Sequence, residues 1–118
     1  MNQREIPRKD WPEFLASFGR RHRSWLATVE EWPREAPERT RAVDQPLESL
    51  GAEDGAIAIH LGNGEVLRVD APRALRVDVT ARGEELGLDL DTARGVTRLR
   101  FRAAALPEEL DGIAPSER

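Results

Sequence analysis

The second half of the chain alternates apolar and polar residues with a period of two, which is typical of strands with one buried face. Glycine- and proline-bearing segments of three to five residues interrupt this alternation at regular intervals. Short strands joined by tight turns predict an antiparallel β-meander. The predicted strands are 56–61, 66–70, 75–80, 86–90 and 98–102.

The turns predict registers, which can be tested because a slip of one residue would move every side chain to the other face. A two-residue turn at Arg82-Gly83 pairs apolar with apolar residues and places charged residues opposite polar or oppositely charged ones. The predicted pairs are Val79 with Leu86, Val77 with Leu88, Leu75 with Leu90, Thr80 with Glu85, and Arg76 with Asp89.

The next turn, Thr92–Gly95, extends this pattern to the last strand, and a three-residue loop at Gly62-Asn63-Gly64 fixes the first hairpin. We expect Asp89 between Arg76 and Arg98 on a solvated face. The predicted pairs are Leu88 with Leu99, Leu86 with Phe101, Asp89 with Arg98, Glu85 with Arg102, Ile59 with Leu67, and Ile57 with Val69.

Residues 10–22 predict a helix. Asp10 can cap it, with Glu13 three residues later as in a capping box, and Pro12 suits the first turn. Gly19 is a candidate stop signal near its end. The apolar positions have helical spacing and form one stripe, Trp11, Phe14, Leu15 and Phe18.

The remaining segments have weaker patterns. Residues 1–9 resemble a polar lead-in, and 24–32 is aromatic and β-branched enough to predict a strand. The proline-bearing, charged stretch 33–46 predicts a loop, with a short edge strand around 39–44. Residues 106–113 predict a short helical turn.

Together these elements predict a single α+β domain over residues 1–118. An N-terminal amphipathic helix packs on an antiparallel β-meander of five to seven strands between residues 24 and 103, because the apolar helix stripe needs an apolar sheet face. Two arrangements stay open: an open sheet under the helix, or a sheet curled into a small barrel that the helix closes at one end.

Composition narrows the functional classes. The chain has 118 residues, no cysteine and a net charge of −4, which excludes disulfides and thiolate metal sites and disfavours nucleic acid as a partner. The polar N-terminus has no apolar core of a secretory signal, and no apolar run approaches the roughly 20 residues that span a membrane. A cytoplasmic location is the expectation. Of the 18 basic residues, only Lys9 is not arginine.

Several segments resemble a family of small, single-domain bacterial proteins that is catalogued as a domain of unknown function. The resemblance covers nearly the whole chain and implies a bacterial, cytoplasmic protein, but it brings no catalytic residues. The segments that carry it are Ile6-Pro7-Arg8, Trp11, Phe14-Leu15, Phe18, Arg21-His22, Trp25-Leu26, Thr28-Val29-Glu30, Phe101-Arg102, Leu106-Pro107-Glu108 and Asp111-Gly112.

No motif predicts catalysis, a cofactor or a metal. The two histidines, His22 and His60, have no ligand cluster around them in the sequence. The serines lie in no nucleophile-elbow context. The predicted registers place Asp89 and Glu85 opposite arginines on a solvated face. Neither carboxylate is therefore predicted to have the shifted pKa of a catalytic acid. Gly62-Asn63-Gly64 precedes a strand and is interpreted as a hairpin turn instead of a phosphate loop.

The arginines are the strongest binding candidates. A stripe of Arg98, Arg100 and Arg102, with Arg94, and a second cluster beside an aromatic residue could hold an anionic backbone. Trp25 and Trp32 lie on opposite faces of the strand 24–32, so one of them could be an exposed anchor. The candidate contacts are Arg20, Arg21, His22, Arg23, Trp25, Trp32, Arg98, Arg100 and Arg102.

These observations favour a non-catalytic module that binds a protein partner or associates with itself. A small-ligand-binding protein or an enzyme is the second hypothesis, with a pocket between helix and sheet near Arg21, His22 and Glu30. Binding of an anion or a nucleic acid through the arginine clusters is the third. No sequence feature identifies the partner.

Overall fold

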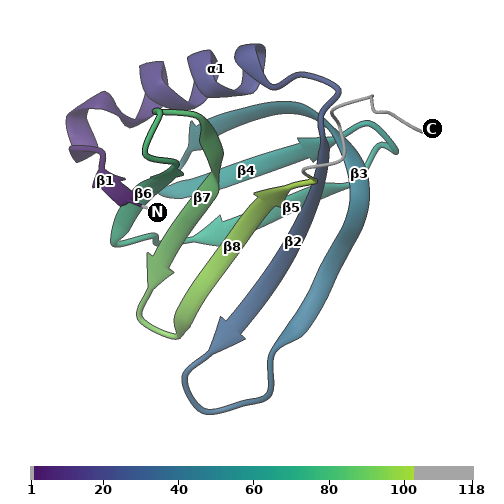
Figure 1. Ribbon diagram of the computed structural model, residues 1–118. Coiled ribbons are helices and arrows are strands. Elements are labelled where there is room, and N and C mark those ends of the chain that lie inside the picture. Colours follow the sequence, from purple (N-terminus) through teal and green to yellow (C-terminus); the bar gives the residue numbers. More distant parts are fainter. Residues whose placement is uncertain (1, 103–118) are drawn as a thin grey trace.

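The computed structural model describes residues 2–102 and shows an α+β fold in which one helix packs on an eight-stranded antiparallel sheet (Figure 1). The elements are β1 (Asn2–Glu5), a 3₁₀ turn (Arg8–Asp10), α1 (Trp11–Arg21), β2 (Leu26–Pro33), β3 (Arg39–Glu53), β4 (Ala56–Leu61), β5 (Val66–Asp70), β6 (Ala74–Val79), β7 (Glu85–Thr92) and β8 (Gly95–Phe101).

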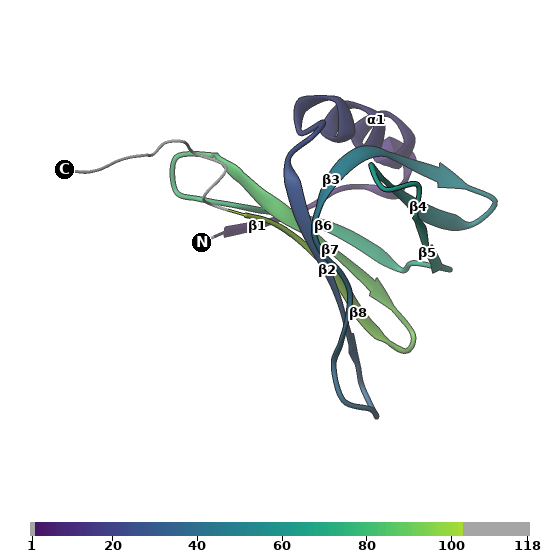
Figure 2. The ribbon, with the colours of Figure 1, turned by 90° about the vertical axis from the view of Figure 1, so that its right-hand side faces the viewer.

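The sheet has the strand order β1-β6-β7-β8-β2-β3-β4-β5 and is strongly bent at β3. The first part of β3 pairs with β2, and its last part pairs with β4. The bend brings β3, β4 and β5 over the inner face of β7, β8 and β2 as a second layer (Figure 2). The hydrophobic core lies between these two layers and under α1.

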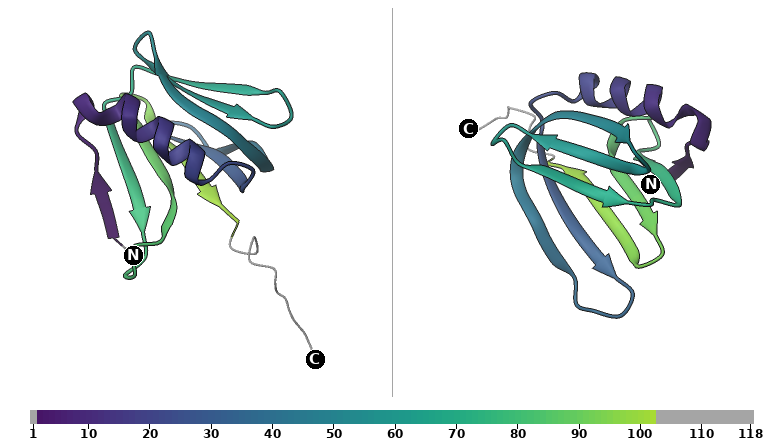
Figure 3. Two further views of the ribbon diagram at one scale, coloured as in Figure 1. Left: turned by 90° about the horizontal axis from the view of Figure 1, so that it is seen from above. Right: turned by 180° about the vertical axis from the view of Figure 1, so that it is seen from behind.

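The sheet does not close into a barrel. β5 and β6 follow each other in the chain but do not pair, and β6 instead pairs with β1 along its outer edge. A turn with Ala71 at φ +48° and Pro72 leads the chain out of the β5 layer. One end of the molecule is therefore covered by α1, and at the opposite end the β2–β3 and β7–β8 hairpins extend beyond β5 (Figures 1 and 3).

The strand predicted around 39–44 is present, but it is longer than expected and is not at an edge, because β3 occupies Arg39–Glu53 and pairs with both β2 and β4. The predicted loop at 33–46 is therefore confined to residues 34–38. Two register shifts interrupt the pairing of β3 with β2, and Asp44 takes a left-handed φ of +49°. Such bulges bend a strand, and proline is tolerated beside them. Pro46 therefore marks the region where β3 passes from one layer to the other, although its sequence resembles that of a loop.

The predicted polar lead-in at 1–9 also contains structure. Asn2–Glu5 forms β1, whose four side chains are exposed and which pairs with β6. An edge strand with two polar faces has no alternation to detect, so its sequence pattern is that of a loop. β1 is the strand that takes the count to eight where five to seven were predicted, because the possible strand around 39–44 was already included.

The helix is confirmed, and two details of its prediction are corrected. Asp10 makes no capping hydrogen bond through its side chain, because its backbone already has helical geometry after the 3₁₀ turn. Gly19 does not stop α1, which continues to Arg21. A Cβ atom at Gly19 would lie 3.1 Å from the Leu50 backbone nitrogen, so the glycine allows close packing of α1 on β3.

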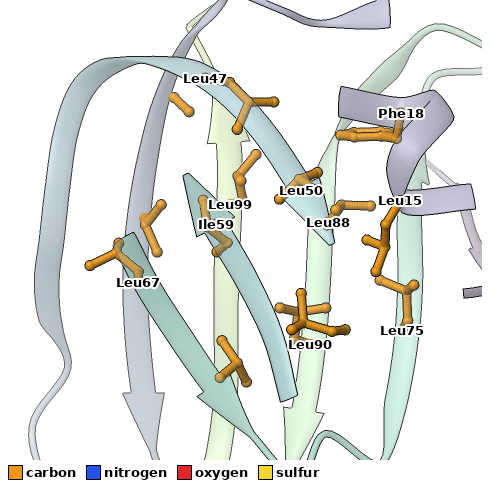
Figure 4. Close-up of a cluster of buried hydrophobic side chains, with 14 of the residues drawn as sticks. Leu15, Phe18, Leu47, Leu50, Ile59, Leu67, Leu75, Leu88, Leu90 and Leu99 are labelled. Atoms are coloured by element: carbon orange, nitrogen blue, oxygen red, sulfur yellow. The ribbon is translucent and has the colours of Figure 1, made fainter. Parts of the chain in front are cut away.

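The buried face of α1 is the predicted stripe, with Trp11, Leu15 and Phe18 buried and Phe14 partly so. The Trp11 indole Nε1–H donates to the Ile6 carbonyl at 2.9 Å, which satisfies its polar atom inside the core. Figure 4 shows Leu15 and Phe18 beside leucines from both layers. The labelled core side chains include Leu47, Leu50, Ile59, Leu67, Leu75, Leu88, Leu90 and Leu99.

Most predicted registers are confirmed, including Val77–Leu88, Leu75–Leu90, Leu88–Leu99, Ile59–Leu67 and Ile57–Val69. A register shift between Asp78 and Val79 places Val79 opposite Glu85, so its predicted pair with Leu86 and the pair of Thr80 with Glu85 are wrong. The pairs Leu86–Phe101 and Glu85–Arg102 do not form, since β7–β8 pairing ends at Gly87–Arg100. The predicted helical turn at 106–113 lies outside the described residues.

Candidate functional site

His22 lies buried at the helix-covered end, where α1 gives way to the β2 layer. Its ring packs against both Phe18 and Phe101, with ring centroids 4.3 Å and 4.7 Å away. Nδ1 is 2.8 Å from the Phe18 carbonyl oxygen, and Nε2 is 3.3 Å from Glu85 Oε1. Burial lowers the pKa of His22, although the Phe18 carbonyl and the Glu85 carboxylate oppose that shift.

Arg21 joins the same cluster, because its guanidinium donates to both Glu85 oxygens at 2.8–3.2 Å and also contacts Ser17. Glu85 thus binds two consecutive residues at the end of α1. Glu30, which was predicted to share a pocket with Arg21 and His22, has other partners. It lies opposite Arg98 in the sheet, and its carboxylate accepts the Trp32 indole N–H at 3.3 Å.

The basic cluster 20–23 does not form one surface. Arg21 and His22 converge on Glu85, whereas Arg23 lies 3.4 Å from Glu48 of β3. Arg20 and Arg23 instead line a shallow depression between α1 and β3. A cluster that is contiguous in sequence is therefore divided between two sides of the helix end.

Both candidate tryptophans are partly exposed. Trp25 is 41% exposed and packs edge-on against His22 and Phe101. Trp32 is 38% exposed, and the Arg98 guanidinium lies 5.4 Å from its ring centroid. The two rings belong to opposite ends of the β2 strand, so they do not form one apolar patch.

The arginine stripe of β8 is occupied by carboxylates of the same chain. Arg98 lies 3.3 Å from Asp89, Arg100 lies 3.0 Å from Asp89 and 3.3 Å from Asp78, and Arg102 lies 3.4 Å from Asp44. Arg94, in the β7–β8 turn, is separate from this stripe. The stripe is thus largely neutralised in place.

The face that carries this stripe is not the solvated face that we expected. Asp89 and Asp78 are only 2% and 4% exposed, because arginine side chains cover them. Gln3 of β1 donates to the second Asp89 oxygen at 2.9 Å. Arg76, the predicted neighbour of Asp89 on one side, instead makes a two-pronged pair with Asp91 at 2.6 and 2.8 Å.

A concave surface lies at the other end of the molecule, and we call it the open-end groove. It has a volume of about 690 Å³ and lies between the ends of β2 and β3, the last residues of β5 and the β7–β8 turn. The hairpins that extend beyond β5 in Figures 1 and 3 provide its lower walls.

The groove begins where the inner sheet face turns polar. On β2 the inward positions change from Val29 to Glu31, and on β8 from Leu99 to Thr97, and these residues pair directly in the sheet. Val29 and Leu99 are core residues, whereas Glu31 and Thr97 line the groove. The same rows of residues that build the core therefore build the groove.

Arginine dominates the charge of the open-end groove. Four arginines line it, Arg39, Arg41, Arg68 and Arg94, against the two carboxylates Glu31 and Asp70. The local excess of positive charge contrasts with the net charge of −4 of the whole chain. Among residues 2–102, Arg94 forms no ion pair, so its charge faces solvent and the groove.

Glu31 holds two of these arginines. Its oxygens accept from Arg39 at 2.8 Å and from Arg41 at 2.5 Å. Burial raises the pKa of Glu31, but the two arginines outweigh that effect, and its pKa lies below its ordinary value. Glu31 is therefore charged at neutral pH, and it orients two guanidinium groups at the edge of the groove.

Of the residues that line this groove, the sequence analysis had singled out only Arg94 and Trp32 as binding candidates. Arg39 and Arg41 lie in the stretch interpreted as a loop, and Arg68 lies in an ordinary alternating strand. Three arginines between residues 33 and 42 were a visible local excess. Arg34, Arg39 and Arg41 could have been weighed with Arg94 only if the 39–53 strand had been recognised.

Within residues 2–102, no three histidine or acidic side chains gather in a way that could hold a metal ion. No helix in this part of the chain has the length and apolar character needed to cross a membrane. No family model, curated protein or solved structure matches the chain. The family resemblance seen in the sequence therefore stays a prediction, and the case for function depends on the site itself.

Proposed function

We propose that this protein is a non-catalytic binding module whose open-end groove takes an anionic partner. The supporting observation is the arrangement of four arginines around one groove of about 690 Å³ on a chain that is otherwise acidic. Clefts lined by one sign of charge concentrate ligands of the opposite sign.

The chemistry of the groove favours binding over catalysis. Arginine stays protonated at any physiological pH and so is a poor general acid or base. The groove's two carboxylates, Glu31 and Asp70, each lie within 3.5 Å of an arginine. The planar guanidinium groups are suited to pairing with carboxylate or phosphate oxygens through parallel hydrogen bonds.

A direct test uses a fluorescein-labelled oligoglutamate peptide and measures its anisotropy at low and high salt. Arg39→Glu and Arg94→Glu should each weaken binding by about tenfold, since each reverses a charge at the groove. Arg82→Glu is a matched control, because Arg82 also precedes a glycine in an exposed β-turn but lies outside the groove. Its affinity should stay close to that of the wild type.

Two results would contradict the proposal. One is no binding of the probe by the wild type even at low salt. The other is an equal loss of affinity in Arg82→Glu and Arg94→Glu, which would show that the probe senses only the overall charge of the protein.

A further inference from the structure

Within residues 2–102, β5 is the last strand of the sheet, and one of its edges has no pairing strand. The sheet order ends at β5, whose single neighbour is β4. The flanking hydrogen bonds, Leu61 N–H to Glu65 and Ala71 N–H to Gly55, set the phase of the β4–β5 ladder. In an antiparallel ladder the bonded residues alternate. The backbone N–H and C=O groups of Leu67 and Val69 therefore point toward β4 and bond with it.

The intervening residues of β5 present their backbone groups to the free edge. By the same alternation these are Val66, Arg68 and Asp70. Their side chains are exposed. An edge of this kind is a template for a further strand unless the protein blocks it.

The open-end groove lies beside the last residues of β5. Arg68–Ala71 form one wall of the groove, and Glu31, Thr97 and Arg39 come from the opposite layer. Figures 1 and 3 show the ends of β2, β3 and β8 continuing beyond β5, so the opposite layer extends past the last strand of the β3–β4–β5 layer. Strands in a sheet are about 4.8 Å apart and packed sheets about 10 Å apart. One further extended chain would continue this layer across the groove.

An added strand would turn alternate side chains toward the inner layer. Those side chains would meet the Arg39 and Arg41 guanidiniums, which Glu31 already orients. Acidic residues at every second position fit this arrangement. The remaining side chains would face solvent, where their chemistry matters little.

We infer that an extended acidic segment of a partner protein binds by adding a strand to the free edge of β5. This inference rests on the proposed function and names the partner class and binding mode for the same groove. The backbone of β5 supplies hydrogen bonds, and the groove arginines select the charge, as in other cases of strand addition. A second copy of the chain is the weaker occupant, because it would place two positively charged grooves side by side.

The first test uses a peptide in which glutamate and valine alternate, and two versions with every second amide N-methylated in opposite phase. Only one set of amides can face β5 in a given register. One methylated version should therefore bind at least about tenfold more weakly, while the other stays within about twofold of the parent peptide.

The second test changes the protein. Arg68→Pro removes both the charge and the free N–H, whereas Arg68→Ala removes the charge alone. Because that N–H points away from β4, proline is compatible with this edge position. Arg68→Pro should bind the parent peptide about tenfold more weakly than Arg68→Ala does. If Arg68→Pro fails to fold, the methylated peptides still test strand addition, because they are measured with the wild-type protein.

The outcomes separate the two proposals. Equal binding of both methylated peptides would overturn strand addition and leave anion binding intact. No binding of the parent peptide or of oligoglutamate would overturn both. Dimerisation that Arg68→Pro abolishes, measured by light scattering, would assign the edge to a second copy and contradict the inference. Loss confined to one methylated peptide, with a monomeric protein, is the supporting result.

Discussion

The two ends of the rolled sheet are built from the same strands and differ in what fills them. At the helix-covered end, the inward residues of β2 and β8 are Ala27, Val29 and Leu99, all buried. At the other end, the inward residues of the same strands are Glu31 and Thr97, and four arginines surround them.

This difference shows how a single period-two pattern can produce a core and a binding surface. The alternation of inward and outward residues continues along β2 and β8, but the inward residues change from apolar to charged on β2 and to polar on β8. Apolar surface at the helix end is removed from water by α1, which stabilises the fold. At the open end no element of the described chain covers the sheet as α1 does, and Glu31 keeps part of its contact with solvent.

The largest expected effect comes from the helix-covered end. Phe18→Ala removes a fully buried ring and should lower the free energy of unfolding by about 3–5 kcal/mol, because it leaves a cavity in a packed core. Arg39→Ala at the open end should change it by less than about 1 kcal/mol, since exposed ion pairs contribute little. Urea denaturation followed by circular dichroism measures both. Similar decreases in the free energy of unfolding of the two variants would contradict the proposed difference between the two ends.

Glu85 tests whether the polar cluster beside the core is also stabilising. Glu85→Ala removes the partner of Arg21 and His22 and should cost about 1–3 kcal/mol in the same assay, since it deletes hydrogen bonds to charged groups. Glu48→Ala is the control, because Glu48 and Arg23 are both largely exposed. It should cost less than about 1 kcal/mol. An equal cost for both would mean that Glu85 stabilises only as a surface charge does.

The pH dependence of stability should be governed by His22 at mildly acidic pH. Burial lowers the pKa of His22 in the folded state below its ordinary value of about 6.5. The unfolded state therefore binds more protons, so stability is lost as the pH falls below about 6.5. The thermal midpoint of the wild type should decrease between pH 7 and pH 5, while that of His22→Gln should change less.

The carboxylates at the open end cannot cause that decrease. The pKa of Glu31 is already below its ordinary value, as is that of Asp91 because of its pair with Arg76. Their stabilising contributions are lost only at more acidic pH. A midpoint that rises toward pH 5 would contradict the expected role of His22 and would indicate that pairing with Glu85 outweighs burial.

The smallest expected effect on stability is that of Glu31→Gln. It removes one carboxylate from partly exposed pairs with Arg39 and Arg41, so the free energy of unfolding should change by less than about 1 kcal/mol. The groove becomes more positive, and the affinity for oligoglutamate should rise by about threefold. Anisotropy titration measures the change. Weaker binding would show that Glu31 matters more as a positioning residue than as a competing charge.

Local signals were sufficient for three of the hairpins, in which both strands alternate regularly and a short turn joins them. The hairpins β4–β5, β6–β7 and β7–β8 follow from alternation and turn residues, and their central pairs are confirmed. The helix stripe of Trp11, Leu15 and Phe18 was found in the same way. In each case the partner lies within a few residues of the turn, so periodicity and turn length are enough to fix the register.

Pairings between distant segments were not accessible to the same reasoning. β1 pairs with β6 more than 70 residues away, and its two polar faces have no alternation that could reveal it. The same limit applies to the buried Asp78 and Asp89. Each pairs with Arg100, and Gln3 also binds Asp89. From sequence, a carboxylate opposite arginines is expected to be exposed to solvent. Its burial becomes evident only when the positions of the side chains that cover it are known.

The sequence by itself determined the α+β class, the helix and its buried stripe, and three hairpins, because these depend on local periodicity and turn chemistry. Only the tertiary structure decided that β3 bends to join two layers, that β1 takes the edge of β6 so that the sheet stays open, and that the arginines of three separate hairpins meet in one groove. Those outcomes depend on which segments far apart in the chain bury one another's surfaces, and residue order alone does not encode that choice in any short pattern.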